Sequence, residues 1–211
     1  MNSSFALMKN FHVIIPEIAV ALFALWALVF GAFKTKKVFH SVTLCSAVFL
    51  LALIPCLMIF MQDYNVPVRA FEGLYVQDFF SLVIKIVISV GCLIALIFMY
   101  SDMPQTNIAR FEAPILVILS MLGMFFMVSS NNFMTLYVGL ELQSLALYIL
   151  AAFNRHSSRA PEAGMKYFIL GALASGMLLF GISFIYGFVG HTGFDEVALA
   201  LQGGDLHAGV I

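Results

Sequence analysis

A glutamate lies near the middle of a long apolar stretch, residues 132–153 ("NFMTLYVGLELQSLALYILAAF"). Glu141 is about ten residues from either end of this stretch, roughly 15 Å at the rise of an α-helix. Its side chain is too short to reach a membrane surface from there, and a charged group near the bilayer centre costs upwards of about 2.5 kcal/mol. Glu141 must therefore face protein or water, be protonated, or be paired. We predict that it handles protons; the alternative is a neutral carboxyl group that hydrogen-bonds across a helix interface.

Polar residues accompany Glu141 at helical spacing. Tyr137, Glu141, Ser144 and Tyr148 follow one another at intervals of four, three and four residues, which places them on one face of a helix. This pattern predicts a polar face around the carboxyl group, with Tyr137 and Ser144 as further candidate site residues.

Lys166 is the candidate partner of Glu141 in proton transfer. It lies about five residues after Pro161, near the start of the next apolar stretch, so the alternative is a lysine whose stem reaches the membrane surface. The two stretches are joined by a short loop and are expected to form antiparallel neighbours. Because Glu141 is deeper by roughly 10 Å at the helical rise, we expect a water-linked or long-range coupling rather than a direct ion pair.

Two further charges occur in apolar stretches. Lys85 lies seven residues into its stretch, and we expect it to extend to the membrane surface; a second internal charge is the alternative. Glu17 lies in the first turn of its helix and is interpreted as a favourable partner of the helix dipole, with a role in proton conduction as the alternative.

The composition defines the class of protein that must position these residues. Of 211 residues, 63% are hydrophobic and only 10% are charged, with a mean hydropathy of +1.04, whereas soluble domains carry about 25% charged residues. The apolar runs are unbroken rather than alternating, which favours helices over a β-barrel. The sequence has no basic cluster for nucleic acid, and its three cysteines show no metal-binding spacing. We predict an all-α, polytopic membrane protein without a cofactor of its own.

Six transmembrane helices are predicted in one membrane domain, followed by a polar tail at 190–211 that is too broken to span. With the N-terminus outside, six Lys and Arg residues fall in inner loops and two in outer segments, which favours this orientation. The predicted spans cover about 16–33, 38–61, 78–100, 114–128, 132–153 and 161–189.

Several of these segments resemble one family closely. The run "GLELQSLALY" around Glu141 is followed about two dozen residues later by "KYFILGALAS", which begins at Lys166; "IPEI" opens the first span and "QDFF" precedes the third. This pattern resembles the subunit N family of the proton-translocating NADH–quinone oxidoreductase, respiratory complex I, along the whole chain.

The resemblance implies the N-terminal part of an antiporter-like fold of about fourteen helices with two inverted repeats. In that family a glutamate on the fifth helix pairs with a lysine on the seventh, and the charge of the pair is linked to proton transfer. Glu141 matches that glutamate, and Lys166 matches the lysine of the sixth helix. The sequence stops at Ile211, where a seventh helix would begin, so we expect a truncated chain.

The resulting hypothesis is a membrane-arm subunit that contributes to proton translocation coupled to quinone reduction in a bacterial inner membrane. NADH, flavin, iron–sulfur clusters and quinone are expected in partner subunits, and other antiporter-like membrane subunits are expected as neighbours. The alternatives are a subunit of a multisubunit cation/proton antiporter and an inert membrane scaffold.

Overall fold

The computed structural model describes residues 12–33, 38–63, 67–102, 110–154, 157 and 159–203. A helix lies at each of the predicted spans, with ends that differ by no more than a few residues. The basic "KTKK" loop falls outside the described residues. In chain order the elements are α2 (Ile15–Phe33), α3 (Val38–Asp63), β1 (Val68–Ala70), the short helix η1 (Phe71–Gly73), β2 (Tyr75–Gln77), α4 (Phe79–Asp102), α5 (Glu112–Val128), α6 (Phe133–Ala151), α7 (Arg159–Val189) and α8 (Phe194–Gly203).

The predicted all-α membrane architecture is confirmed. Five of the described helices are long and apolar enough to cross a membrane, and α5 is a shorter apolar helix of 17 residues. Large apolar side chains such as Leu25, Phe98 and Leu173 point outward, with 62%, 69% and 62% of their surface exposed. Such an outer surface suits lipid, because in water it would favour aggregation.

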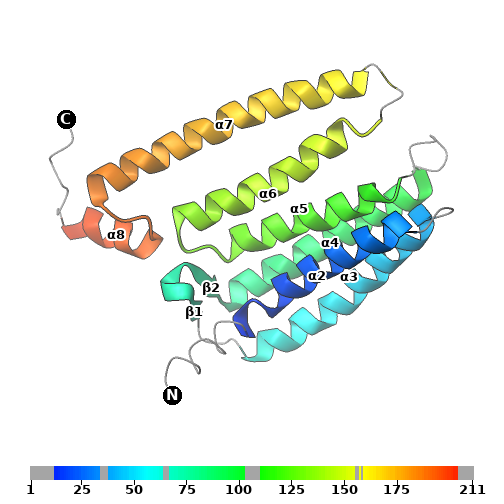
Figure 1. Cartoon of the computed structure of the whole chain (residues 1–211). Coiled ribbons are helices and arrows are strands. Elements are labelled where there is room, and N and C mark those ends of the chain that lie inside the picture. Colours follow the sequence, from blue (N-terminus) through cyan, green and yellow to red (C-terminus); the bar gives the residue numbers. More distant parts are fainter. Residues whose placement is uncertain are drawn as a thin grey trace.

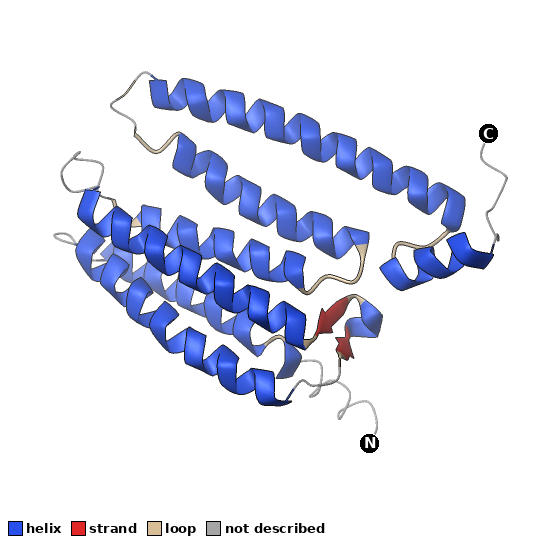
Figure 2. Cartoon of the chain, turned by 180° about the vertical axis from the view of Figure 1, so that it is seen from behind, coloured by secondary structure: helices blue, strands red, loops and turns tan. Residues whose placement is uncertain are grey.

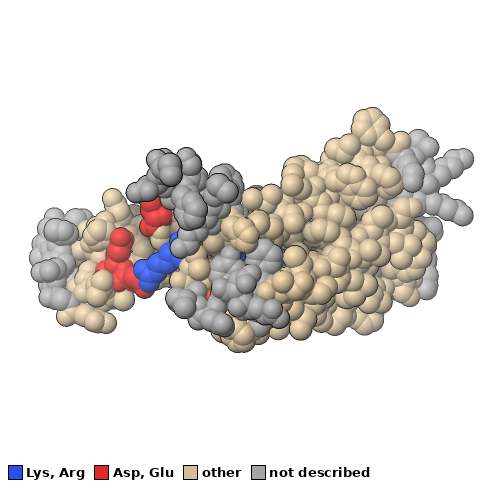
Figure 3. Space-filling model, turned by 90° about the horizontal axis from the view of Figure 1, so that it is seen from below, with Lys and Arg blue, Asp and Glu red and all other residues tan. Residues whose placement is uncertain are grey.

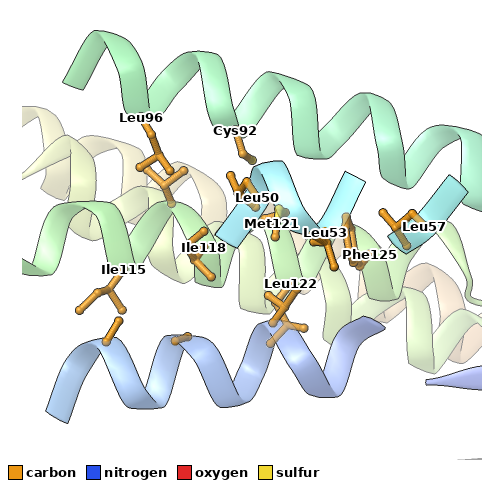
Figure 4. Close-up of a cluster of buried hydrophobic side chains, with 14 of the residues drawn as sticks. Leu50, Leu53, Leu57, Cys92, Leu96, Ile115, Ile118, Met121, Leu122 and Phe125 are labelled. Atoms are coloured by element: carbon orange, nitrogen blue, oxygen red, sulfur yellow. The ribbon is translucent and has the colours of Figure 1, made fainter. Parts of the chain in front are cut away.

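The helices form a bundle with two further helices stacked on one side of it. Figures 1 and 2 show α2 to α5 gathered together, α6 lying against α5, and α7 outermost. The interior of the bundle is apolar and contains side chains from all four of its helices. The close-up in Figure 4 shows, among others, Leu50, Leu57, Leu96, Met121 and Phe125 converging there.

The backbones of α5 and α6 approach each other closely at two glycines. A Cβ atom on Gly123 would lie 2.5 Å from the backbone nitrogen of Gln143, and one on Gly139 would lie 2.9 Å from the carbonyl oxygen of Gly123. Small residues permit this approach, and helices in membranes are held together by such close packing because lipid supplies no hydrophobic drive. The contact fixes the position of α6, and with it Glu141, against the bundle.

One end of the bundle is covered by an assembly of short elements. Strands β1 and β2 pair antiparallel, and β2 joins the turn between α5 and α6 through a hydrogen bond from Val76 N to Ser129 O, 2.8 Å. That turn continues to α8, because Phe194 N donates to Asn131 O at 3.1 Å. Figure 3 shows acidic and basic side chains gathered at this end. Arg69 and Asp195 form an exposed ion pair at 2.8 Å. We call β1, η1, β2 and the α5–α6 turn the hairpin cap.

Neither the hairpin nor α8 is predicted from the sequence, where residues 62–77 fall between two predicted spans and 190–211 are expected to form a polar tail. The two strands pair with each other locally, but the hairpin and α8 are both joined to the α5–α6 turn, which lies far from either along the chain. Local sequence therefore carries little of the signal. The hairpin strands have only three residues each, and strands this short depend on tertiary contacts.

Candidate functional site

Glu141 is held on α6 by a well-defined helix start. The side chain of Asn132 caps the helix by accepting a hydrogen bond from Met134 N at 2.8 Å, as capping asparagines commonly do. Glu141 is half-buried, and its Oε1 atom is enclosed without a hydrogen-bond partner among the described residues. An enclosed carboxyl oxygen with no donor is a place where a proton or a water molecule can bind.

A cavity of about 500 Å³ lies between α6 and α7; its lining includes Leu140 and Gln143, neighbours of Glu141, but not Glu141 itself. Ser144, one turn after Glu141 on the same face, lines it together with Gln143 and Tyr148; from α7, Tyr167 and Ser175 complete its polar lining. These hydroxyl and amide groups can hydrogen-bond water inside the membrane region. Tyr137, one turn before Glu141, is half-buried and is not among the lining residues.

The structure does not bring Lys166 to Glu141. The Lys166 ammonium group binds Glu162, one turn earlier on α7, at 2.6 Å, and the two side chains are 69% and 62% exposed. No ion pair joins Lys166 to Glu141 within the part of the chain that the structure describes. The expectation that the two would not form a direct ion pair therefore agrees with the geometry, and their long-range coupling stays a prediction.

Lys85 does not extend to a membrane surface. Its Nζ atom lies 2.7 Å from Oε1 of Glu17, and the two side chains are only 0% and 1% exposed. The expectation of a surface-reaching lysine is thus wrong, and the alternative of a second internal charge holds. The physical reason is the hairpin cap, whose Tyr75 and Gln77 supply polar partners at the end of α4 so that the ammonium group need not leave the protein.

Every donor of the Lys85 ammonium group has an acceptor. Besides Glu17, Nζ donates to the hydroxyl oxygen of Tyr75 at 2.9 Å and to Oε1 of Gln77 at 2.6 Å. The Tyr75 hydroxyl in turn donates to Oε1 of Glu17 at 2.6 Å. The ring of Phe125 lies 5.8 Å from Nζ, within the range of a cation–π attraction. Three elements, α2, β2 and α4, therefore meet at one buried charge pair.

From the sequence, Glu17 is interpreted as a favourable partner of the helix dipole. The structure shows that it also forms a buried ion pair. It occupies the first turn of α2, but its carboxylate is buried against Tyr75 and Lys85. The available signal is that opposite charges occur at the same end of two apolar helices. Tyr75 and Gln77 give no such signal, because they lie in a segment that reads as an ordinary polar loop.

Comparison with known proteins identifies the class. Residues 130–210 match the family model described as "NADH:quinone oxidoreductase/Mrp antiporter, TM". The NADH-quinone oxidoreductase subunit N of Parvibaculum lavamentivorans is 42% identical over 211 residues, covering 100% of this chain and 43% of that protein. The subunit N of Paramagnetospirillum magneticum is 44% identical over 194 residues, covering 92% and 39%.

A solved structure agrees with these relatives. A chain of respiratory complex I from Thermus thermophilus with bound aureothin superposes with a TM-score of 0.70 and 28% identity, over 85% of this chain and 38% of that one. The helical bundle and the family match define an antiporter-like membrane subunit. Within that class, the chain belongs to the subunit N family of NADH-quinone oxidoreductases. It spans about two fifths of the length of the curated relatives it matches.

Proposed function

We propose that the chain is part of a membrane-arm subunit that contributes to proton translocation coupled to quinone reduction. The observation that carries the proposal is Glu141: a carboxyl group in an apolar membrane helix, with an enclosed oxygen that has no partner among the described residues. Its chain neighbours Gln143 and Ser144 contribute polar groups to the mostly apolar cavity between α6 and α7. The names of the relatives support the same function. NADH, flavin, iron–sulfur clusters and quinone would be bound by partner subunits, which include other antiporter-like membrane subunits.

The proposed chemistry is the loading and release of a proton by Glu141. Burial favours the neutral carboxyl group, whereas a nearby cation favours the carboxylate. A cation that approaches Glu141 therefore drives the proton off, and a cation that withdraws lets a proton return. Lys166 is the candidate for this cation within the chain; leaving Glu162 would free its ammonium group for the role. The polar cavity beside Ser144 would supply water to carry the proton.

The proposed location is a bacterial inner membrane, with the N-terminus and the hairpin cap on the periplasmic side. The support is the distribution of Lys and Arg among the loops. Labelling a cysteine placed at Arg69 from the periplasmic side checks the orientation, because Arg69 is an exposed residue of the cap.

A subunit of a multisubunit cation/proton antiporter is the second candidate, because the matching family model also covers Mrp antiporters. Such a protein would use the same glutamate without redox partners. Purification of the full-length protein with iron–sulfur and flavin subunits favours the oxidoreductase, whereas its purification without any of them favours the antiporter.

The Glu141→Gln variant is the direct test of the proposed function. The amide keeps the shape of the side chain and cannot titrate, so we expect proton pumping to be impaired while assembly is retained. The proton-to-electron ratio is measured in vesicles with equal amounts of assembled complex, and Glu196→Gln, a change of the same kind at an exposed glutamate on α8, is the control. A normal ratio in Glu141→Gln would remove Glu141 from the translocation path and leave an inert scaffold as the better description.

The role of Lys166 is tested by comparing two replacements. If its charge acts on Glu141, Lys166→Ala should lower the pumping rate, and Lys166→Arg, which keeps the charge, should lower it much less. Stability should change little in either variant, because an exposed ion pair contributes only about 0–1 kcal/mol. Equal pumping by parent and Lys166→Ala would leave Lys166 as a surface residue paired with Glu162.

A further inference from the structure

The Glu17–Lys85 pair lies in surroundings that make fixed charges expensive. Both side chains are at most 1% exposed, and the apolar side chains of Leu82 and Phe125 in the same core are completely buried. Apolar residues of similar volume often serve as well as a buried ion pair, or better, because desolvation offsets the Coulomb attraction. Stability alone therefore does not explain a glutamate and a lysine at this place, and ionisable residues inside a membrane protein point to a function.

The two charged groups are not equally well satisfied. The ammonium group of Lys85 has three acceptors, whereas the carboxyl group of Glu17 receives both of its donors, Lys85 and Tyr75, on Oε1. Glu17 Oε2 is buried with no partner among the described residues, and so is Nε2 of Gln77. One acceptor atom on Glu17 and one donor atom on Gln77 are thus left without a partner among the described residues, and both side chains bind the ammonium group of Lys85. A water molecule that accepts from Nε2 and donates to Oε2 would satisfy both.

We propose that Glu17 is a second proton-exchanging carboxyl group of the chain, with Lys85 as its immediate proton donor and a bound water as its link to the hairpin cap. The proposal rests on the function proposed above, and it assigns to the end of the bundle under the cap a site separate from Glu141. Glu17 lies on α2 and Glu141 on α6, with α5 packed against both helices.

The exchange consists of two balanced steps. First, the N–H bond of Lys85 that points to Glu17 breaks and an O–H bond forms on Oε1, which leaves a neutral acid and a neutral amine. Second, a hydronium ion on the side of the cap gives its extra proton to the amine, which becomes an ammonium group again and leaves a neutral water molecule. The net result is one proton taken up, and the reverse sequence releases it. The 2.7 Å separation of Nζ and Oε1 permits the first step without movement of the helices.

Polar groups from several elements surround the Glu17–Lys85 pair. From β2 come the Tyr75 hydroxyl and the amide of Gln77, and from α5 comes the ring of Phe125. The hydroxyl of Ser129, in the turn after α5, binds Gln77. Asp78, which precedes α4, acts on Lys85 by a Coulomb attraction only; its carboxylate accepts from Ser81 N at 2.7 Å.

Infrared difference spectroscopy during acidification tests the proposal, with the full-length protein in its native complex. A carboxylic-acid C=O band with the amplitude of one carboxyl group should appear in the parent and be missing from Glu17→Gln. It should be kept in Asp195→Asn, which removes an exposed carboxylate at the same end of the bundle. Because the band is recorded without turnover, its loss or retention is independent of whether Glu141→Gln pumps normally.

A double variant without either charge keeps the proposal testable if Glu17→Gln does not fold. Glu17→Gln/Lys85→Gln keeps polar groups at both positions and leaves no buried charge, so it should assemble and should also lack the band. In Lys85→Met the difference band should be missing as well, because the variant lacks the ammonium group that donates the proton to Glu17. Identical spectra for the parent and Glu17→Gln, or for the parent and the double variant, would overturn the proposal and make the pair a permanent ion pair.

Discussion

The Lys85→Met change is expected to destabilise the folded protein by about 3–5 kcal/mol, the usual cost of removing one partner from a buried ion pair. Methionine fills a similar volume, so the loss is electrostatic: Glu17, 1% exposed, keeps only Tyr75 as a partner. The expected observation is a much lower unfolding midpoint in detergent, or a strongly reduced amount of protein in the membrane.

Two comparisons separate charge from packing in that experiment. Lys166→Met removes an ammonium group from an exposed ion pair and should change stability by no more than about 1 kcal/mol. Adding Glu17→Gln to Lys85→Met removes the unpaired carboxylate, so the double variant should regain much of the lost stability. If the double variant is as unstable as Lys85→Met, the cost lies in lost packing or lost hydrogen bonds rather than in the unpaired charge.

Gly123→Ala should destabilise the packing of α6 on α5 by about 1–3 kcal/mol or more, the cost of inserting a methyl group into a filled interior. The new Cβ would be 2.5 Å from the backbone nitrogen of Gln143 and 2.7 Å from the carbonyl oxygen of Gly139. Backbone atoms cannot rotate away, so the helices must separate. A lower unfolding midpoint in detergent is the expected result, with reduced pumping because Glu141 shifts along with α6.

Gly91→Ala is the matched control for this change. Gly91 is also a glycine within a membrane helix, and a Cβ placed there meets nothing within 4 Å. Alanine is a better helix former than glycine by about 1 kcal/mol, so Gly91→Ala should be neutral or stabilising. If Gly123→Ala proves as harmless as Gly91→Ala, the close approach of α5 and α6 is not what fixes Glu141.

The structure places charge at two separate positions in the membrane domain. Glu141 lies on α6, and its Oε1 atom has no partner among the described residues. Glu17 and Lys85 lie beneath the hairpin cap and bind each other. A carboxyl group without an ion-pair partner and a carboxyl group held against an ammonium group will respond differently to a change in local charge. The variants described above distinguish these two sites.

The class of protein and the helices are determined by the sequence itself. Unbroken apolar runs of about twenty residues can hide their backbone polar groups in a membrane only as helices, and prolines, polar loops and basic residues mark where the helices end. Glu141 stands out for the same reason: a carboxylate in the middle of such a run is costly wherever the run is placed. The motif around it carries the resemblance to the subunit N family.

Only the tertiary structure decides whether a charged side chain near a helix end is buried or exposed. Lys85 and Lys166 look alike in sequence, since each lies a few residues inside an apolar helix, and either could reach a membrane surface. Lys85 is completely buried and Lys166 is largely exposed, because Tyr75 and Gln77 of the hairpin cap cover the end of α4 and bind its ammonium group. The strands that carry them have three residues each and form through pairing with each other and with the α5–α6 turn. The contact with the α5–α6 turn joins segments far apart in sequence and leaves almost no local pattern, so the buried ion pair appears only when the chain is folded.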